Sequence, residues 1–335
     1  MIISYLRKNL LTLHPLLTSF LSPWGRLGTL EEALNVAPTP QRVASPHLQR
    51  WQGRGLLFTL MTTALSPIGV FDSGYGGLTI LDGIRRLMPQ FDYAYLGDNA
   101  RAPYGTRSFD VVYQFTLQGV EALFDLGCPL VVLGCNTASA KALRSIQQNY
   151  IALKMPDRRV LGVIRPTTEV VGSLSRNLHI GVLATEGTIR SESYKLEIER
   201  LHPGSVVTGL ACPMWVPLIE NGEYDQPGAD YFVQKYIDQL LTKDPQIDTI
   251  ILGCTHYPLL MEKIRQYTPL GITLVPQGRY VAASLHDYLH RHPDMRARIS
   301  TGGTCRYLTT ESAEKFRESA SVFLHEDVEV EHITL

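Results

Sequence analysis

From Ile68 onward, short apolar runs alternate with stretches of helical periodicity, and this alternation constrains the fold more than any other feature of the sequence. The runs are rich in Val, Ile and Leu, as expected of strands that are buried on both faces. Strands separated by helices pair in parallel, because each helix returns the chain to the starting edge of the sheet. The pattern therefore predicts an α/β protein with doubly wound, mainly parallel sheets.

The same alternation predicts the individual elements. We expect strands at Ile68–Phe71, Tyr93–Leu96, Leu130–Leu133, Val160–Val163, Ile180–Leu183, Val206–Gly209, Thr249–Leu252 and Ile272–Val275. We expect helices at Gly77–Met88, Phe109–Leu126, Ala138–Tyr150, Ser191–Leu201, Asp230–Leu241, Pro258–Gln266 and Ser312–Leu324.

A weak internal repeat indicates that the α/β unit is duplicated. Ile68–Phe71 (IGVF) is similar to Ile180–Leu183 (IGVL), and Val131–Cys135 (VVLGC) is similar to Ile250–Cys254 (IILGC). The two matches come in the same order and at nearly the same spacing. The second match carries more weight, because it includes a Gly-Cys pair at the end of a strand. The repeat predicts two similar lobes.

The first sixty residues differ from the rest of the chain. Met1–Arg54 is interrupted by prolines and is basic, with far more Arg and Lys than Asp and Glu. We interpret residues 1–60 as a poorly ordered N-terminal extension, with Met61 as an alternative start of the protein. A targeting segment is the other interpretation, because Arg7 and Lys8 precede an apolar stretch.

Charge and cysteine content exclude several functional classes. Lys and Arg total 31 against 32 for Asp and Glu, a balance that argues against a nucleic-acid-binding protein. No apolar run is long enough to span a membrane. The five cysteines are an odd number without a C-x-x-C pair, which favours a reduced, cytoplasmic setting without disulfides or a zinc site.

Two of the cysteines occupy matching positions in the repeat. Cys135 and Cys254 each follow a strand and a glycine and precede a helix, the place where ligands bind in α/β sheets. A helix N-terminus lowers the pKa of a thiol from about 8.5, so we expect a thiolate to be accessible near neutral pH. We expect the other three, Cys128, Cys212 and Cys305, to be small core residues.

Polar residues follow both thiols and suggest a carboxylate ligand. Asn136 and Thr137 follow the first, and Thr255 and His256 follow the second. Side chains of this kind, together with N–H groups at a helix start, bind carboxylates. Two acid–base groups from two lobes suit a reaction that removes a proton from one face of a carbon and replaces it on the other. That reaction is racemisation or epimerisation, and nothing in the sequence calls for a cofactor or a metal.

With these motifs the chain resembles the glutamate racemases, a family of cofactor-independent two-cysteine amino-acid racemases. The resemblance is close from Pro67 to Leu289 and does not include residues 1–60. It rests on the segments Ile68–Leu78, Tyr95–Asp98, Pro103–Gly105 with Ser108, Leu133–Ala138, Gly162–Pro166, Pro217–Glu220 and Leu252–Leu260.

The resemblance implies a fold, a substrate and partners. It implies two α/β lobes related by a pseudo-two-fold axis, with the active site between them. We place the first lobe at residues 67–161 plus 271–335 and the second at 162–270. The implied activity is interconversion of L- and D-glutamate, supplying D-glutamate for peptidoglycan. A homodimer is compatible with the resemblance, whereas nucleic-acid and membrane partners are not expected.

The resemblance also implies catalytic roles. Cys135 matches the base that acts on D-glutamate, and Cys254 matches the base that acts on L-glutamate. Asp72 matches a group that supports the first thiol. His256 and Glu220 match groups that assist proton transfer at the second thiol. A buried core histidine and a solvated glutamate are the alternative interpretations of these last two residues.

Substrate contacts are implied at eight positions around the two thiols. They are Asp72, Ser73, Tyr104, Gly105, Asn136, Thr137, Thr255 and His256. Two departures from the family, Arg165 before a proline and the segment Pro276-Gln277-Gly278-Arg279 near the last predicted strand, are expected to affect regulation and subunit contacts more than chemistry.

Other functions remain open at this point. A racemase of aspartate or another amino acid would use the same two thiols. An amino-acid-binding module would bind without turnover. A thiol oxidoreductase would need a resolving cysteine beside Cys135 or Cys254, and no C-x-x-C spacing provides one.

Overall fold

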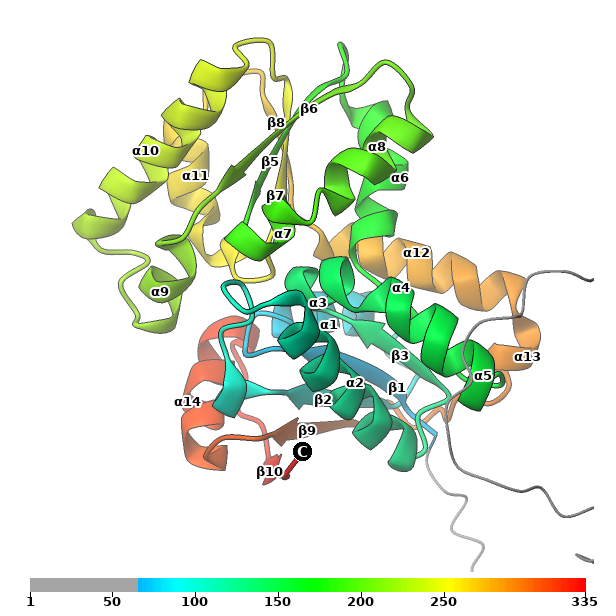
Figure 1. Ribbon diagram of the computed structural model, residues 1–335. Helices are drawn as coiled ribbons and strands as arrows, with labels where there is room; N and C mark the ends of the chain where they lie inside the picture. The colour runs from blue at the N-terminus through cyan, green and yellow to red at the C-terminus, as the bar shows by residue number, and fades with distance from the viewer. Residues whose placement is uncertain (1–65) are drawn as a thin grey trace, which may run out of the picture. The chain divides into compact units, whose positions relative to one another are not determined.

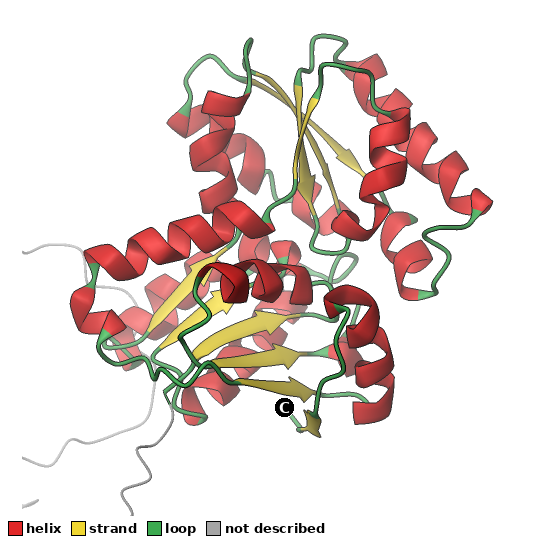
Figure 2. Ribbon diagram, turned by 180° about the vertical axis from the view of Figure 1, so that it is seen from behind, coloured by secondary structure: helices red, strands yellow, loops and turns green. Residues whose placement is uncertain are grey.

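The computed structural model describes residues 66–335, which form two parallel β-sheets with helices on both faces (Figures 1 and 2). The expected α/β class is confirmed. Residues 1–60, for which a poorly ordered extension is predicted, and Met61 lie outside the described residues. No helix in the range 66–335 is long and apolar enough to cross a membrane.

The first sheet has six strands in the order β10-β9-β2-β1-β3-β4, and the second has four in the order β6-β5-β7-β8. The first sheet contains β1 (Ile68–Asp72), β2 (Tyr93–Gly97), β3 (Leu130–Leu133), β4 (Arg159–Gly162), β9 (Cys305–Thr309) and β10 (Val330–His332). The second contains β5 (His179–Ala184), β6 (Val206–Ala211), β7 (Thr249–Gly253) and β8 (Thr273–Val275).

The internal repeat falls on equivalent strands. In each sheet the first strand of the lobe lies between the second and the third, and the fourth pairs with the third. The IGV motifs form β1 and β5, and the LGC motifs end β3 and β7. Because parallel strands end at one edge, Cys135 and Cys254 follow equivalent strands at equivalent edges.

The predicted lobe boundary is wrong at residues 271–275. Strand β8 pairs with β7 in the register Thr249↔Thr273, so these residues belong to the second sheet. The chain passes between the lobes at two places. Val163 links β4 to α6 (Ile164–Leu174), and Pro276–Gln277 links β8 to α12 (Gly278–Arg291).

All seven predicted helical segments are helical in the structure. The first-lobe helices are α1 (Leu78–Leu87), α2 (Phe109–Asp125), α3 (Asn136–Lys141), α4 (Leu143–Ser145), α5 (Ala152–Lys154), α12, α13 (Pro293–Arg296) and α14 (Ala313–Leu324), with a π-turn at Ile146–Ile151 and a 3₁₀ turn at Asn99–Arg101. The second-lobe helices are α6, α7 (Glu186–Arg190), α8 (Ser193–Leu201), α9 (Trp215–Glu220), α10 (Pro227–Lys243) and α11 (Met261–Tyr267), with a 3₁₀ turn at Tyr257–Leu260.

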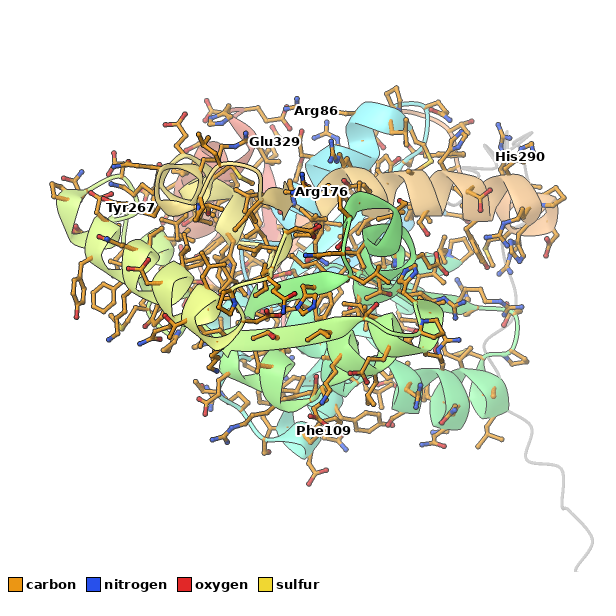
Figure 3. All side chains as sticks on the ribbon, turned by 90° about the horizontal axis from the view of Figure 1, so that it is seen from above. Arg86, Phe109, Arg176, Tyr267, His290 and Glu329 are labelled. Atoms are coloured by element: carbon orange, nitrogen blue, oxygen red, sulfur yellow. The ribbon has the colours of Figure 1, made fainter. Side chains whose placement is uncertain are left out.

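Burial on both faces explains the continuous apolar runs. Ile68 and Val70 of β1 pack into one core cluster, and Phe71 packs into the cluster on the opposite face. Many charged side chains lie on the outer surfaces instead. Arg86 on α1 and Arg176 before β5 have side chains 74% and 76% exposed (Figure 3).

Candidate active site

The carboxyl ends of β1, β3 and β7 bring together residues from both lobes. Asp72 ends β1, Cys135 follows β3, and Cys254 follows β7. The loop after β1 lies between the two cysteine segments, because Ser73 contacts Cys135 while Asp72 contacts Thr255. The structure therefore brings the predicted catalytic residues of the two lobes to one place.

The thiol of Cys135 is at the N-terminus of α3 and is almost fully buried. Its Sγ lies 3.4 Å from the backbone N–H of Ala138, which donates to it, and 3.4 Å from Ser73 Oγ. Burial, together with the negative charge of Asp72, raises the pKa of Cys135 to about 12. The expectation of an accessible thiolate is therefore wrong for this thiol in the absence of substrate, because desolvation outweighs the helix start.

Cys254 has a different neighbour. Its Sγ lies 3.8 Å from Nδ1 of His256, and Nε2 of the same ring lies 3.0 Å from Glu220 Oε1. Burial lowers the pKa of His256, but the hydrogen bonds to Cys254 and Glu220 outweigh burial and raise it to about 10. Glu220 ends α9 and its side chain is 27% exposed. The second thiol is thus the start of a Cys-His-Glu chain that leads toward solvent.

Asp72 is completely buried at the end of β1. Its Oδ1 accepts from the N–H of Gly74 at 2.9 Å, and its Oδ2 accepts from Thr255 Oγ1 at 3.5 Å. Burial raises the pKa of Asp72 to about 6, although the charge of His256 opposes this. A carboxyl group with this pKa can take up or release a proton near neutral pH.

The glycine loop after β1 fits closely against the second thiol segment, which gives a testable prediction. A Cβ on Gly76 would lie 2.3 Å from Thr255 Oγ1 and 2.4 Å from His256 Nδ1. We expect Gly76→Ala to displace His256 and to lower kcat/KM by about 10²-fold. Steady-state kinetics of the purified variant measures this.

Gly74→Ala is the matched control for this loop. Its Cβ would meet no atom nearer than Glu220 Oε1 at 3.7 Å, an ordinary van der Waals contact. We expect its kinetics to stay close to wild type. Equal losses in the two variants would show that the loop tolerates no Cβ at all, and that the fit against His256 is not the cause.

Three threonine hydroxyls meet beside Cys135 and form what we call the threonine cluster: Thr137, Thr185 and Thr188. Thr137 Oγ1 lies 2.9 Å from Thr185 Oγ1 and 3.4 Å from Thr188 Oγ1. Thr185 and Thr188 were not expected. Extending the repeat by two residues aligns Thr185 with Ser73, and this alignment was the available signal.

Other predicted contact residues also form hydrogen bonds within the protein. The hydroxyl of Tyr104 donates to Asp98 inside the core and is buried there. The carbonyl of Gly105 accepts from the N–H of Gly187 at 2.8 Å, which ties this loop to the second lobe. The Asn136 side chain bonds to Gln277 and Tyr194.

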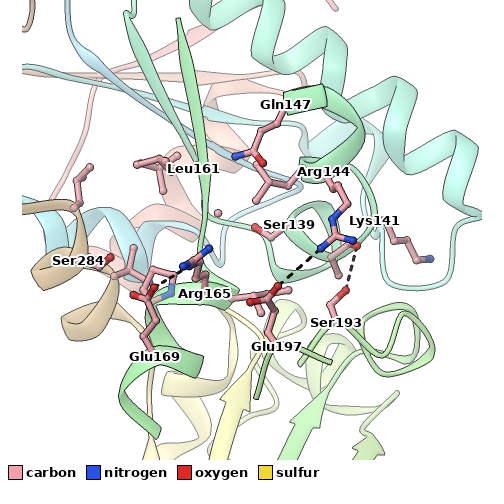
Figure 4. Close-up of a pocket in the computed structure, with 18 of the residues that line it drawn as sticks. Ser139, Lys141, Arg144, Gln147, Leu161, Arg165, Glu169, Ser193, Glu197 and Ser284 are labelled. Carbon is pink, nitrogen blue, oxygen red and sulfur yellow. Dashed lines mark hydrogen bonds and ion pairs between the residues drawn. The ribbon is translucent and has the colours of Figure 1, made fainter. Parts of the chain in front are cut away.

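The two departures from the family lie in different surroundings. Arg165 forms an exposed ion pair with Glu169 at 2.8 Å and lines a cavity of about 720 Å³ between the lobes (Figure 4). Neither Cys135 nor Cys254 lines this cavity. Gln277, in contrast, is buried against Asn136, the residue that follows Cys135.

This fold and this pair of thiols define a class of enzyme. The chain belongs to the Asp/Glu/hydantoin racemase family, whose pattern matches residues 78–283. Its curated relatives include the glutamate racemases of Roseobacter denitrificans, 39% identical over 78% of this chain and 98% of that protein, and of Paracoccus denitrificans, 38% identical over 79% and 98%.

Solved structures agree with this assignment. Glutamate racemase from Bacillus anthracis is 33% identical, with a TM-score of 0.74 over 81% of this chain and 98% of that one. Glutamate racemase from Francisella tularensis in complex with D-glutamate is 32% identical, with a TM-score of 0.71 over 80% and 97%.

Proposed function

We propose that this chain is a glutamate racemase that interconverts L- and D-glutamate with two acid–base thiols. The observation that carries the proposal is the placement of Cys135 and Cys254 at equivalent strand ends of two lobes. Each thiol has its own proton-handling neighbours, Ser73 and Asp72 for the first and His256 with Glu220 for the second. The similarity to glutamate racemases supports the assignment of this chain as an isomerase.

The two thiols divide the reaction between them. From L-glutamate, Cys254 removes the α-proton, and Cys135, which holds its proton at neutral pH, donates that proton to the opposite face. From D-glutamate the roles are exchanged, and Cys135 must act as a thiolate. The α-ammonium of the substrate would offset the charge of Asp72 that raises the pKa of Cys135.

Substrate binding needs donors for two carboxylates. The threonine cluster supplies three hydroxyls from both lobes. The first turn of α3 supplies N–H groups at Asn136 and Thr137. Asp72 and Thr255, whose side chains are hydrogen-bonded to each other, can hold the α-ammonium. We assign the threonine cluster to the side-chain carboxylate, the feature that separates glutamate from neutral amino acids.

The test is racemisation without any cofactor. We expect the purified protein to racemise glutamate, followed by chiral chromatography, in the presence of a chelator and without pyridoxal phosphate. Aspartate, which is one methylene shorter, should be turned over at least about tenfold less efficiently. A requirement for pyridoxal phosphate, or faster turnover of aspartate, would refute the proposal. Glutamate binding without turnover would indicate the binding-module alternative.

The biological role follows from the product. D-glutamate is a building block of bacterial peptidoglycan, and supply of D-glutamate for that synthesis is the role of the family. A cytoplasmic location is part of this proposal, because peptidoglycan precursors are made there. A homodimer stays a prediction.

A further inference from the structure

The side-chain amide of Gln277 lies where the two crossings between the lobes meet. Gln277 is in the second crossing and Val163 is the first. One N–H of Gln277 Nε2 is shared between the carbonyl oxygen of Val163, at 3.2 Å, and Thr167 Oγ1, at 3.1 Å. Because Gln277 is only 2% exposed, these bonds form away from water and hold the crossings together.

Gln277 also closes a ring of three hydrogen bonds. Asn136 Nδ2 donates to Gln277 Oε1 at 2.6 Å, Gln277 Nε2 donates to Tyr194 Oη at 2.7 Å, and Tyr194 Oη donates to Asn136 Oδ1 at 2.7 Å. We call this set the amide ring. Each member donates once and accepts once around it, so the directions are consistent. All three residues are buried, and loss of one member removes one hydrogen-bond partner from each of the other two.

The amide ring reaches both thiol segments. Asn136 directly follows Cys135 at the start of α3. On the other side, the ring of Tyr194 packs against Gly253, the residue before Cys254: a Cβ on Gly253 would lie 3.2 Å from Cε2 of Tyr194. Asn136 belongs to the first lobe and Tyr194 to the second, so the amide ring, in which Gln277 bonds to both, connects the backbone beside one thiol to the backbone beside the other.

We propose that Gln277 is a positioning residue that sets the separation of Cys135 and Cys254 across the substrate carbon. The inference rests on the proposed two-thiol racemisation. Both sulfurs must reach one carbon from opposite faces, and a displacement of about 1 Å can cost about 10²-fold in rate. Removal of a proton by one sulfur alone does not depend on where the other lies. The amide ring therefore controls the two-sided reaction more than the one-sided one.

Two variants break the amide ring, and one matched variant spares it. Gln277→Met keeps the length of the side chain and removes the amide. Tyr194→Phe removes only the hydroxyl. Thr167→Val is the control, because Thr167 is fully buried and bonds to Gln277 without being a member of the ring.

The measurement compares a two-sided reaction with a one-sided one. Racemisation of glutamate needs both thiols, whereas elimination from 3-chloroglutamate needs only one, because a single thiolate takes the α-proton while a Cα–Cβ double bond forms and chloride leaves the β-carbon. We expect both ring variants to lower kcat for racemisation at least about tenfold, with KM and elimination changed less than about threefold. The double variant should racemise glutamate no more slowly than the less active single variant, because both substitutions break the same ring. Thr167→Val should lose thermal stability but keep its ratio of racemisation to elimination.

The outcomes are separable. If racemisation and elimination fall together, or if Thr167→Val shows the same altered ratio, Gln277 has only a structural role and the inference is wrong. Racemisation within about twofold of wild type in both ring variants also overturns it. If Gln277→Met does not fold, Tyr194→Phe decides alone. Absence of glutamate racemisation in the wild-type protein would instead reject the proposed function.

Discussion

Replacement of either Cys135 or Cys254 by Ala is expected to abolish racemisation, with a loss of at least about 10²–10⁴-fold in kcat. Each thiol acts as base in one direction and as acid in the other, so neither direction survives without both. The double variant should be no less active than the singles, because the pair acts as a unit. Serine would replace either residue poorly, since a hydroxyl is a far weaker acid than a thiol.

Cys128→Ala is the matched control for this experiment. Cys128 is also a fully buried free cysteine, but it lies before β3, at the opposite end of the strand from Cys135. We expect this variant to lose some stability and to keep its activity. Racemisation near the wild-type rate in Cys135→Ala or Cys254→Ala would exclude the two-thiol mechanism.

Each cysteine variant should still process one enantiomer of 3-chloroglutamate. Cys254→Ala retains Cys135 and should eliminate chloride from the D form, while Cys135→Ala retains Cys254 and should act on the L form. The other enantiomer should react at least about 10²-fold more slowly in each variant, because its α-proton faces the missing thiol. Chloride release from each pure enantiomer measures the preference.

The direction of this preference is the informative result. Opposite preferences assign one thiol to each face of the substrate carbon. A shared preference for one enantiomer would mean that both sulfurs lie on the same face of the substrate carbon, and would exclude the two-thiol mechanism. Loss of elimination from both enantiomers in both variants would mean that the thiols cannot act separately.

The sequence predicted the parts of the fold whose pattern is local. The eight expected strands are all present within two residues of their predicted ends, because buried parallel strands are continuous apolar runs. Strands β9 and β10 were missed. The first reads CRYLT and is only partly buried, and the second is three residues long at the sheet edge with exposed polar side chains. Neither shows the apolar run on which the prediction relied.

The site was predictable where the repeat marked it. Cys135 and Cys254 follow from two copies of one strand-end motif, and their immediate neighbours came with them. Thr188 and Gln277 did not, because each acts through a partner far along the chain, Thr137 in one case and Asn136 in the other. The pKa of Cys135 was also out of reach, since burial depends on how tightly the whole lobe packs around the sulfur.

The two thiols have different neighbours, but thermodynamics limits the effect of this difference on the reaction. L- and D-glutamate have the same free energy in water, so their equilibrium constant is unity and kcat/KM must be identical in the two directions. Ser73 beside one sulfur and the His256–Glu220 pair beside the other therefore cannot favour either product at equilibrium. They can only change kcat and KM of each direction together, so that the ratio kcat/KM stays equal in the two directions. Net conversion of L- to D-glutamate in the cell therefore requires that a later reaction consumes D-glutamate.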